Sequence, residues 1–310
     1  MTSFIRYFLH SKTLLVFTLL VLSFAIQSQI VIKNKLVKKG AHLEKLAGGY
    51  VFTEGPACDK DGNVYFTDQP NNQIIKWSVD GTVSVFLTGK GRVNGLCFDK
   101  QGNLIACSEE KNELWSISSD GKITVLLKEY KGKRFNAPND VWISPNENIY
   151  FTDPLYMRKW WNYPMPEQDG EHVYLVSPDY SKITRITTDL VRPNGIIGTP
   201  DGKILYIADL GAKKTYKYKI GNDGLLYDKK LFVDRGSDGM TIDNKGNVYL
   251  TDVDGVSVFN PKGEEILHIT NPDGKTGNIC FGGKKRDILF ITALTSVYGL
   301  KMNVRGVNPQ

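Results

Sequence analysis

The chain has 310 residues, 41% of them hydrophobic, so it is long enough to bury a sizeable core. Its net charge of +6 is a mild excess without a block of Lys or Arg, which does not indicate a nucleic-acid-binding protein. It has four Cys and no Cys-x-x-Cys pair, which in practice excludes a thiolate metal site.

The first 28 residues are typical of a secretory signal. Arg6 and Lys12 precede an apolar run over residues 13–26, which is short for a transmembrane helix and suits the apolar core of a signal peptide. We therefore expect residues 29–310 to form an exported domain, periplasmic or secreted, with a net charge of +4 and no other membrane segment. The alternative is an uncleaved anchor, because no Ala-x-Ala cleavage box follows the run.

Six segments similar to Asp-Lys-x-Gly-Asn-Val-Tyr-Phe-Thr-Asp recur along the chain, and each begins five residues after another polar or acidic residue. They begin at Asp59, Asp99, Ser144, Thr199, Asp243 and Gly283. The residues five positions earlier are Glu54, Asn94, Asn139, Asn194, Asp238 and Asn278. Both series step by 40, 45, 55, 44 and 40 residues, a period typical of the blades of a β-propeller.

The first unit shows four strand patterns. Residues 55–58, 63–67, 74–78 and 83–87 are apolar or alternating, and Asp/Gly or Pro/Asn turns separate them. The last unit supplies only three such segments, and residues 42–46 (HLEKL) offer the missing one. We therefore predict an all-β, six-bladed β-propeller closed by an N-terminal strand, which removes two exposed sheet edges.

In such a propeller the six polar residues would form a ring around the axis. Glu54, Asn139, Asn194 and Asp238 would then offer two carboxylates and two amide oxygens to one point, a donor set that suits a hard cation such as calcium. Zinc has little support, because the four His at positions 10, 42, 172 and 268 avoid the ring. For each residue taken alone, the alternative is a structural cap on backbone groups.

Three further features have alternative interpretations. The Asp residues that end the second strands (Asp68, Asp153, Asp209 and Asp252) suggest structural turns. Cys97 and Cys107 can form a bridge between neighbouring strands or remain buried thiols. An insertion over residues 154–170 carries Tyr156, Trp160, Trp161 and Tyr163, which either cover the mouth of the propeller or pack on the blade edge.

The motifs EGP at 54–56, RFNAPND at 134–140, RPNGI at 192–196 and GSDGM at 236–240 resemble those of the senescence-marker-protein, gluconolactonase and luciferin-regenerating-enzyme family. The resemblance covers residues 40–305 and implies a propeller that binds one divalent cation and hydrolyses sugar lactones. It implies metal binding by Glu54, Asn194 and Asp238, metal or substrate binding by Asn139, and an acid/base role for Asp238.

Substrate contacts are also expected on this basis. The family's substrate-binding Arg has no counterpart, because position 137 is Ala, and Arg134 lies near enough in sequence to take its place. We therefore expect Asn139, Arg134, Asn94, Tyr156 and Trp160 to contact a small-molecule lactone. Calcium is the favoured cation, and zinc, magnesium and manganese are the alternatives. The sequence specifies no oligomeric state.

A lactone is a cyclic ester, so its hydrolysis requires a polarised carbonyl and an activated water. A cation would supply both, with Asp238 accepting the proton. No Gly-x-Ser-x-Gly motif supports a covalent serine mechanism. Two alternatives remain: an arylesterase or phosphotriesterase-type propeller, similar to serum paraoxonase or diisopropyl-fluorophosphatase, and a non-catalytic propeller that binds a partner.

Overall fold

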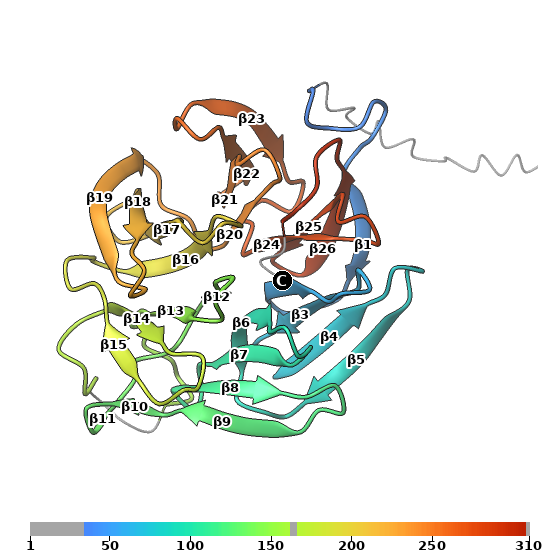
Figure 1. Cartoon of the computed structure of the whole chain (residues 1–310). Helices are drawn as coiled ribbons and strands as arrows, with labels where there is room; N and C mark the ends of the chain where they lie inside the picture. Colours follow the sequence, from blue (N-terminus) through green and yellow to red (C-terminus); the bar gives the residue numbers. More distant parts are fainter. Residues whose placement is uncertain (1–33, 162–165, 308–310) are drawn as a thin grey trace, which may run out of the picture.

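The computed structural model describes residues 34–161 and 166–307, which form six four-stranded β-sheets around a common axis (Figure 1). The predicted all-β, six-bladed propeller is therefore confirmed. The predicted signal peptide and Tyr163 lie outside the described residues. Within the described part, no helix is long and apolar enough to cross a membrane.

The sheets follow one another in sequence, and each extends outward from the strand nearest the axis. Blade one is β2 (Thr53–Cys58), β3 (Val64–Asp68), β4 (Gln73–Trp77) and β5 (Val83–Thr88), and blade two is β6 (Val93–Phe98), β7 (Leu104–Ser108), β8 (Glu113–Ile117) and β9 (Ile123–Leu127). Blade three is β12 (Val141–Ile143), β13 (Ile149–Asp153), β14 (His172–Val176) and β15 (Ile183–Arg185), and blade four is β16 (Pro193–Gly198), β17 (Ile204–Asp209), β18 (Lys214–Ile220) and β19 (Leu226–Val233). Blade five is β20 (Met240–Ile242), β21 (Val248–Thr251), β22 (Gly255–Phe259) and β23 (Glu265–Thr270), and blade six is β24 (Ile279–Gly282), β25 (Ile288–Ala293), β26 (Ser296–Lys301) and β1 (Glu44–Gly48).

The N-terminal strand closes blade six as expected, two residues later than the sequence indicated. β1 pairs with β26 in antiparallel register, with Glu44 opposite Gly299 and Gly48 opposite Ser296. Figure 1 shows the blue β1 beside the red strands of the other end of the chain. Chain ends separated by the whole propeller therefore share one sheet.

The repeated Asp-x-x-Gly-Asn segment is the turn between the first two strands of a blade. In blade one, the Asp59 carboxylate accepts the Asn63 N–H at 2.8 Å and the Asn63 side-chain amide at 2.8 Å. Asp243 and Asn247 make the same pair of bonds in blade five, at 3.0 and 2.8 Å. The carboxylate satisfies donors that the tight turn would leave unpaired, so the motif recurs wherever this turn is built.

Apolar side chains fill the spaces between neighbouring blades. In the described residues six buried clusters occur, one at each interface between two blades. For example, Ile105 of β7 packs with Val141, Phe151 and Tyr174 of blade three. The core is thus a closed circle, which fixes the inner strands and the residues at their entry relative to one another.

Candidate active site

The six polar residues of the repeat lie at the entry of the innermost strands, and we call them the ring (Glu54, Asn94, Asn139, Asn194, Asp238 and Asn278). All are buried except Asp238, whose side chain is 16% exposed. Consecutive members are in close contact, because the Gly95 N–H after Asn94 donates to the Asn139 carbonyl at 2.7 Å. A Cβ at Gly239, the residue after Asp238, would lie 2.1 Å from Asn278 Cγ, so only glycine fits there.

The Asp residues at the ends of the second strands bind the backbone of the segments that lead to the ring. Asp153 accepts the N–H groups of Asn136 and Ala137 at 3.0 and 2.8 Å, and Asp209 accepts those of Val191 and Arg192 at 2.9 Å each. Each bonded pair lies two or three residues before a ring residue. The structural interpretation of these carboxylates is therefore confirmed, and they position Asn139 and Asn194.

Two carboxylates of the ring lie close enough to interact. Glu54 is 3% exposed, and burial, followed by the charge of Asp238, raises its pKa well above the ordinary value. The charge of Lys275 and the Gly55 N–H, which donates to Glu54 Oε2 at 3.2 Å, act in the opposite direction. A pair of buried carboxylates requires a compensating positive charge.

Lys275 supplies a positive charge in the structure. Its Nζ lies 3.0 Å from Asp238 Oδ2. Burial lowers the pKa of Lys275, but the charge and hydrogen bond of Asp238 outweigh that effect, so the pKa is raised above the ordinary value. The ammonium group therefore lies beside Asp238, and its charge also acts on Glu54, so it partly offsets the two negative charges.

Asn194 joins the acidic pair to the aromatic insertion. Its Nδ2 donates to Asp238 Oδ1 at 2.8 Å and to Tyr156 Oη at 2.8 Å. Its Oδ1 is buried and has no hydrogen-bond partner among the described residues. Because a buried amide oxygen normally has a partner, this atom is an available acceptor or metal ligand beside Asp238.

The donor set fits a hard cation. Glu54 and Asp238 offer carboxylate oxygens, and Asn194 offers the unpartnered Oδ1. No three His, Cys, Asp or Glu side chains in residues 34–161 and 166–307 gather as a metal site, so any cation here depends on the amide oxygens as well. The residues predicted as ligands thus provide oxygens alone.

The sequence matches the SMP-30/Gluconolactonase/LRE-like region over residues 52–295. The chain belongs to this family. It is 30% identical over 294 residues to a gluconolactonase of Zymomonas mobilis, a match that covers 85% of this chain and 82% of that protein. A gluconolactonase structure from Xanthomonas campestris is 30% identical, covers 86% of this chain and 91% of that chain, and has a TM-score of 0.80.

A calcium-binding regucalcin from Agrobacterium tumefaciens shares the fold, with a TM-score of 0.72 at 18% identity over 85% of this chain and 95% of that one. The family predicted from the four motifs is confirmed, and so is the enzyme class, a carboxylic-ester hydrolase of the gluconolactonase type.

The aromatic insertion reaches the ring in this family member. The Tyr156 ring lies beneath two guanidinium groups, with Arg158 Cζ 5.2 Å and Arg192 Cζ 5.3 Å from the ring centroid. Trp160 packs against Arg92 and Arg158, at 4.7 and 5.5 Å from their Cζ atoms. We call the region of Tyr156, Trp160, Arg92, Arg158, Arg192 and Lys275 the mouth.

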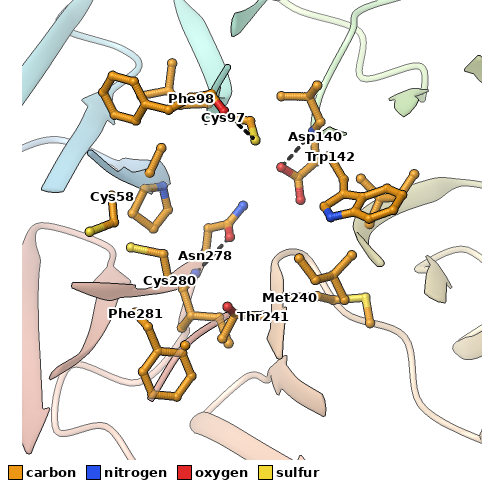
Figure 2. A pocket seen from close by; sticks show the side chains of 18 of the residues that line it. Cys58, Cys97, Phe98, Asp140, Trp142, Met240, Thr241, Asn278, Cys280 and Phe281 are labelled. Atoms are coloured by element: carbon orange, nitrogen blue, oxygen red, sulfur yellow. Dashed lines mark hydrogen bonds between the residues drawn. The ribbon is translucent and has the colours of Figure 1, made fainter. Parts of the chain in front are cut away.

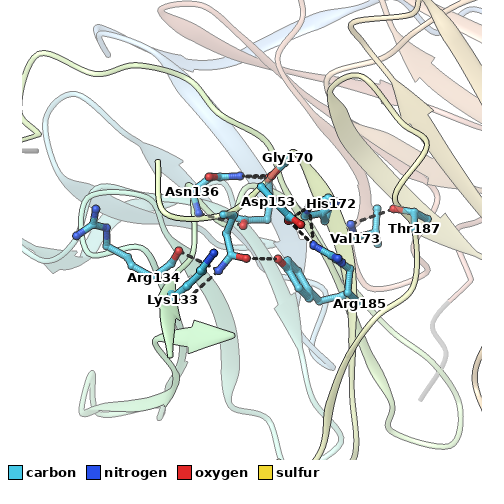
Figure 3. Close-up of polar contacts among 12 residues, drawn as sticks. Lys133, Arg134, Asn136, Asp153, Gly170, His172, Val173, Arg185 and Thr187 are labelled. Carbon is cyan, nitrogen blue, oxygen red and sulfur yellow. Dashed lines mark hydrogen bonds and ion pairs between the residues drawn. The ribbon is translucent and has the colours of Figure 1, made fainter. Parts of the chain in front are cut away.

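Arg134 is held at the base of the insertion. It lies on the short hairpin of β10 (Glu129–Tyr130) and β11 (Lys133–Arg134), where its Nη1 pairs with Glu167 Oε1 at 3.0 Å. Gln168 Nε2 donates to the carbonyls of Lys133 and Arg134 at 2.8 and 3.1 Å (Figure 3). These contacts attach the insertion to blade three, whereas the guanidinium groups beside Tyr156 belong to Arg158 and Arg192.

The inner strands continue past the ring and line a cavity of about 110 Å³, the tunnel cavity. Figure 2 shows Asp140 facing this space together with Cys58, Cys97 and Cys280. All four Cys are free thiols, so the Cys97–Cys107 bridge is not formed. Burial raises the pKa of Cys58 to about 11 and that of Cys97 to about 12, which keeps these thiols protonated.

Asp140 was missed in the sequence although it belongs to the RFNAPND motif. Four of the other five ring residues are followed by Gly, and Asn278 is followed by Ile, so this carboxylate departs from the pattern. Burial raises its pKa to about 7, while hydrogen bonds from Val141, Ile196 and the Asn278 side chain act in the opposite direction.

The sequence analysis also missed three cationic residues near the ring, Lys275, Arg158 and Arg192. Lys275 lies three residues before the last ring position, which is the only sequence signal for it.

Proposed function

We propose that the protein is a metal-dependent lactonase that opens sugar lactones at the ring. The observation that carries the proposal is the Asn194 amide, which bridges Asp238 and Tyr156 through Nδ2 and leaves Oδ1 buried without a partner among the described residues. Two carboxylates, an available amide oxygen and an aromatic side chain thereby meet at one point, which is the arrangement that a cation and a small polar substrate would use.

Glu54, Asn194 and Asp238 would hold the cation, with Asn139 as a fourth donor, and we favour calcium because all these donors are oxygens. Bound there, a divalent cation would polarise the lactone carbonyl and lower the pKa of a water molecule. Asn194 orients Asp238 through the 2.8 Å bond to Oδ1. The cost of burying Glu54 beside Asp238 explains why the site would bind a cation strongly.

Asp238 would act as the general base. It is the most exposed carboxylate of the ring, and Oδ1 is fixed by Asn194 while Oδ2 faces Lys275. A carboxylate held in this way can accept the proton of the water that attacks the lactone carbonyl and return it to the leaving alkoxide. Tyr156, Trp160, Asn94, Asn139 and Arg134 are proposed to contact the sugar.

The other hydrolase alternative has no particular support. His172 Nε2 lies 3.0 Å from Asp169 and His268 Nε2 lies 3.3 Å from Asp254, and neither histidine belongs to the ring. We also propose that residues 1–28 export the protein, since the composition of that segment supports a signal peptide.

The test combines metal analysis with a lactonase assay. Purified protein is dialysed against chelator, its metal content is measured, and hydrolysis of aldonolactones is followed by pH-stat with and without added calcium. The proposal requires hydrolysis that disappears with the metal and returns with it. Glu54→Gln should bind no metal, whereas Glu129→Gln, a matched change on the exposed β10 strand, should behave as wild type. Full activity in chelator would contradict the proposal.

A further inference from the structure

A single aromatic side chain, Tyr156, separates two guanidinium groups from the candidate metal ligands. Arg158 and Arg192 both pack over Tyr156, and Tyr156 Oη is 2.8 Å from Asn194 Nδ2. Arginine stays charged at any ordinary pH, so both positive charges are permanent. The sugar contacts proposed above do not use them.

Each of these arginines is paired through Nε, and its two terminal NH₂ groups stay available. Arg158 Nε pairs with Glu109, which is fully buried, and Arg192 Nε lies 3.3 Å from Glu171 Oε2. The terminal nitrogens of both side chains have no hydrogen-bond partner among the described residues, and the side chains are 29% and 42% exposed. A guanidinium held at Nε presents two terminal NH₂ groups in the geometry that binds carboxylate or phosphate.

The charge balance of the mouth also favours an anion. Its described cations are Arg92, Arg158, Arg192 and Lys275. The carboxylates that face them are Glu54, Asp238, Glu109 and Glu171. These two sets cancel, so a bound divalent cation would give the mouth an excess of positive charge. Lys275, displaced from Asp238, would add an ammonium group that is free to pair with an anion.

We propose that the substrate is a lactone that carries an anionic substituent, a carboxylate or a phosphate, at the end of the sugar carbon chain opposite the carbonyl carbon. Arg158 and Arg192 bind this substituent while the lactone carbonyl lies at the ring. The inference rests on the proposed lactonase function and specifies the substrate class. A neutral sugar lactone would leave both guanidinium forks without a partner.

The opposing explanation is that the two arginines only join segments. Arg158 of the insertion pairs with Glu109 after β7, and Arg192 before β16 pairs with Glu171 before β14. A purely structural role predicts that their removal affects neutral and anionic lactones equally, through stability. An anion site predicts a change in KM that is confined to the anionic lactones.

The experiment compares three lactones that differ in one substituent: D-glucono-1,5-lactone, its 6-phosphate, and the 1,5-lactone of glucaric acid, which has a carboxylate at that carbon. With metal-loaded wild-type protein, we expect kcat/KM for an anionic lactone to exceed that for the neutral one by about 10- to 100-fold. Comparing kcat/KM for the 6-phosphate and for the glucaric acid lactone shows whether the site prefers phosphate or carboxylate. Equal kcat/KM for all three would overturn the inference while leaving the lactonase function intact.

Variants assign the effect to the two arginines. Arg158→Met and Arg192→Met should each raise KM for the preferred anionic lactone about tenfold, with KM for the neutral lactone changed less than about twofold. Arg158→Lys should restore part of the effect because it keeps the charge. Arg185→Met is the matched control, because it removes an arginine of β15 that pairs with Asp169. It should change KM for neither the neutral nor the anionic lactone. Equal loss for neutral and anionic lactones would assign the arginines a structural role.

A binding measurement separates this inference from the proposed function. The metal-loaded protein is titrated by calorimetry with gluconate, 6-phosphogluconate and glucarate, the ring-opened forms of the three lactones. Tighter binding of an acid that is anionic at both ends, lost in Arg158→Met and Arg192→Met, would support the anion site even if no lactone were hydrolysed. Indistinguishable binding of the three acids, together with lactone hydrolysis, would reject the anion site alone.

Discussion

The ring and the tunnel cavity beside it carry acidic groups in different environments, and we call these the ring end and the tunnel end. At the ring end, Glu54 and Asp238 lie beside the Lys275 ammonium and the Asn194 amide, and the Asp238 side chain is 16% exposed toward the mouth. At the tunnel end, Asp140, the residue after Asn139, faces a cavity of about 110 Å³ lined by thiols, apolar side chains, Thr241, Asn278 and Arg286 (Figure 2). A cation can reach the first pair. Among the described residues Asp140 is the only acidic side chain lining its cavity, which Arg286 also lines, and burial raises the Asp140 pKa to about 7.

The comparison shows how one repeat yields two environments for carboxyl groups. The same turns and strands place a residue at each of six equivalent positions, which makes a ring, but the chemistry depends on which blades carry carboxylates there. Asp140 occupies the position where four blades have Gly, so its carboxylate points into the tunnel rather than to the mouth. The ring end is the expected site of catalysis, whereas the tunnel end holds one carboxyl group whose pKa burial raises to about 7.

The largest effect is expected from removing a charge at the ring. Glu54→Gln and Asp238→Asn should each reduce kcat/KM by about 1,000-fold or more, because each removes one of the two charges that would hold the cation. Circular dichroism should show an intact propeller. Asp140→Asn is the matched control at the tunnel end and should keep its metal, as measured by calorimetry. Full activity and full metal content in Glu54→Gln would show that the ring is not the site.

Removing the competing ammonium group should have a smaller effect of opposite sign. Lys275→Met deletes the charge 3.0 Å from Asp238 Oδ2, so a cation no longer has to displace it. Calorimetric titration of the metal-free protein should show about fivefold tighter calcium binding. Lys301→Met removes a comparably exposed lysine paired with Asp287 in blade six and should leave the affinity unchanged. Weaker binding in Lys275→Met would show that this side chain supports the site rather than competing for it.

The ring and the closing strand could both be predicted from the sequence. The ring followed from the fixed offset between Glu54, Asn194 or Asp238 and the next repeat, because a closed array puts equivalent residues at equivalent places. The closing strand followed from the missing fourth strand of the last unit. The ring and the closing strand depend only on backbone topology, and the repeat period of the sequence indicates that topology.

Side chains that reach the ring from loops left no periodic signal. Arg158 lies in an insertion found in one blade, and Lys275 lies in the loop before blade six, so their positions depend on loop conformation. Arg134 was favoured as a substrate contact because it is near Asn139 in sequence, yet its guanidinium pairs with Glu167 at the base of the insertion.

A modest effect is expected from the aromatic part of the mouth. Trp160 packs against Arg92 and Arg158 and is half-buried, so it offers one face to a sugar. Trp160→Ala should raise KM for lactones about threefold with little loss of bound metal, because aromatic contacts of this kind contribute modestly. Tyr180→Ala, at an exposed turn of blade three, is the control. Parallel losses of thermal stability and activity would instead make Trp160 a packing residue.

The smallest effect concerns Asp140 and tests the tunnel end directly. Its pKa is raised from 3.8 to about 7, chiefly by burial, so the folded protein binds this proton more tightly than the unfolded chain does. The associated stability is fully present below about pH 4 and is lost as the pH rises through about 7. Asp140→Asn carries no such group, so the Tm difference between wild type and variant should shift by a few degrees, on the order of 5 °C, across this range. Calorimetric scans of chelator-treated proteins at several pH values would measure it. Since Asn keeps the shape but not the charge, parallel Tm curves for the two proteins would mean that Asp140 does not take up a proton in the tunnel.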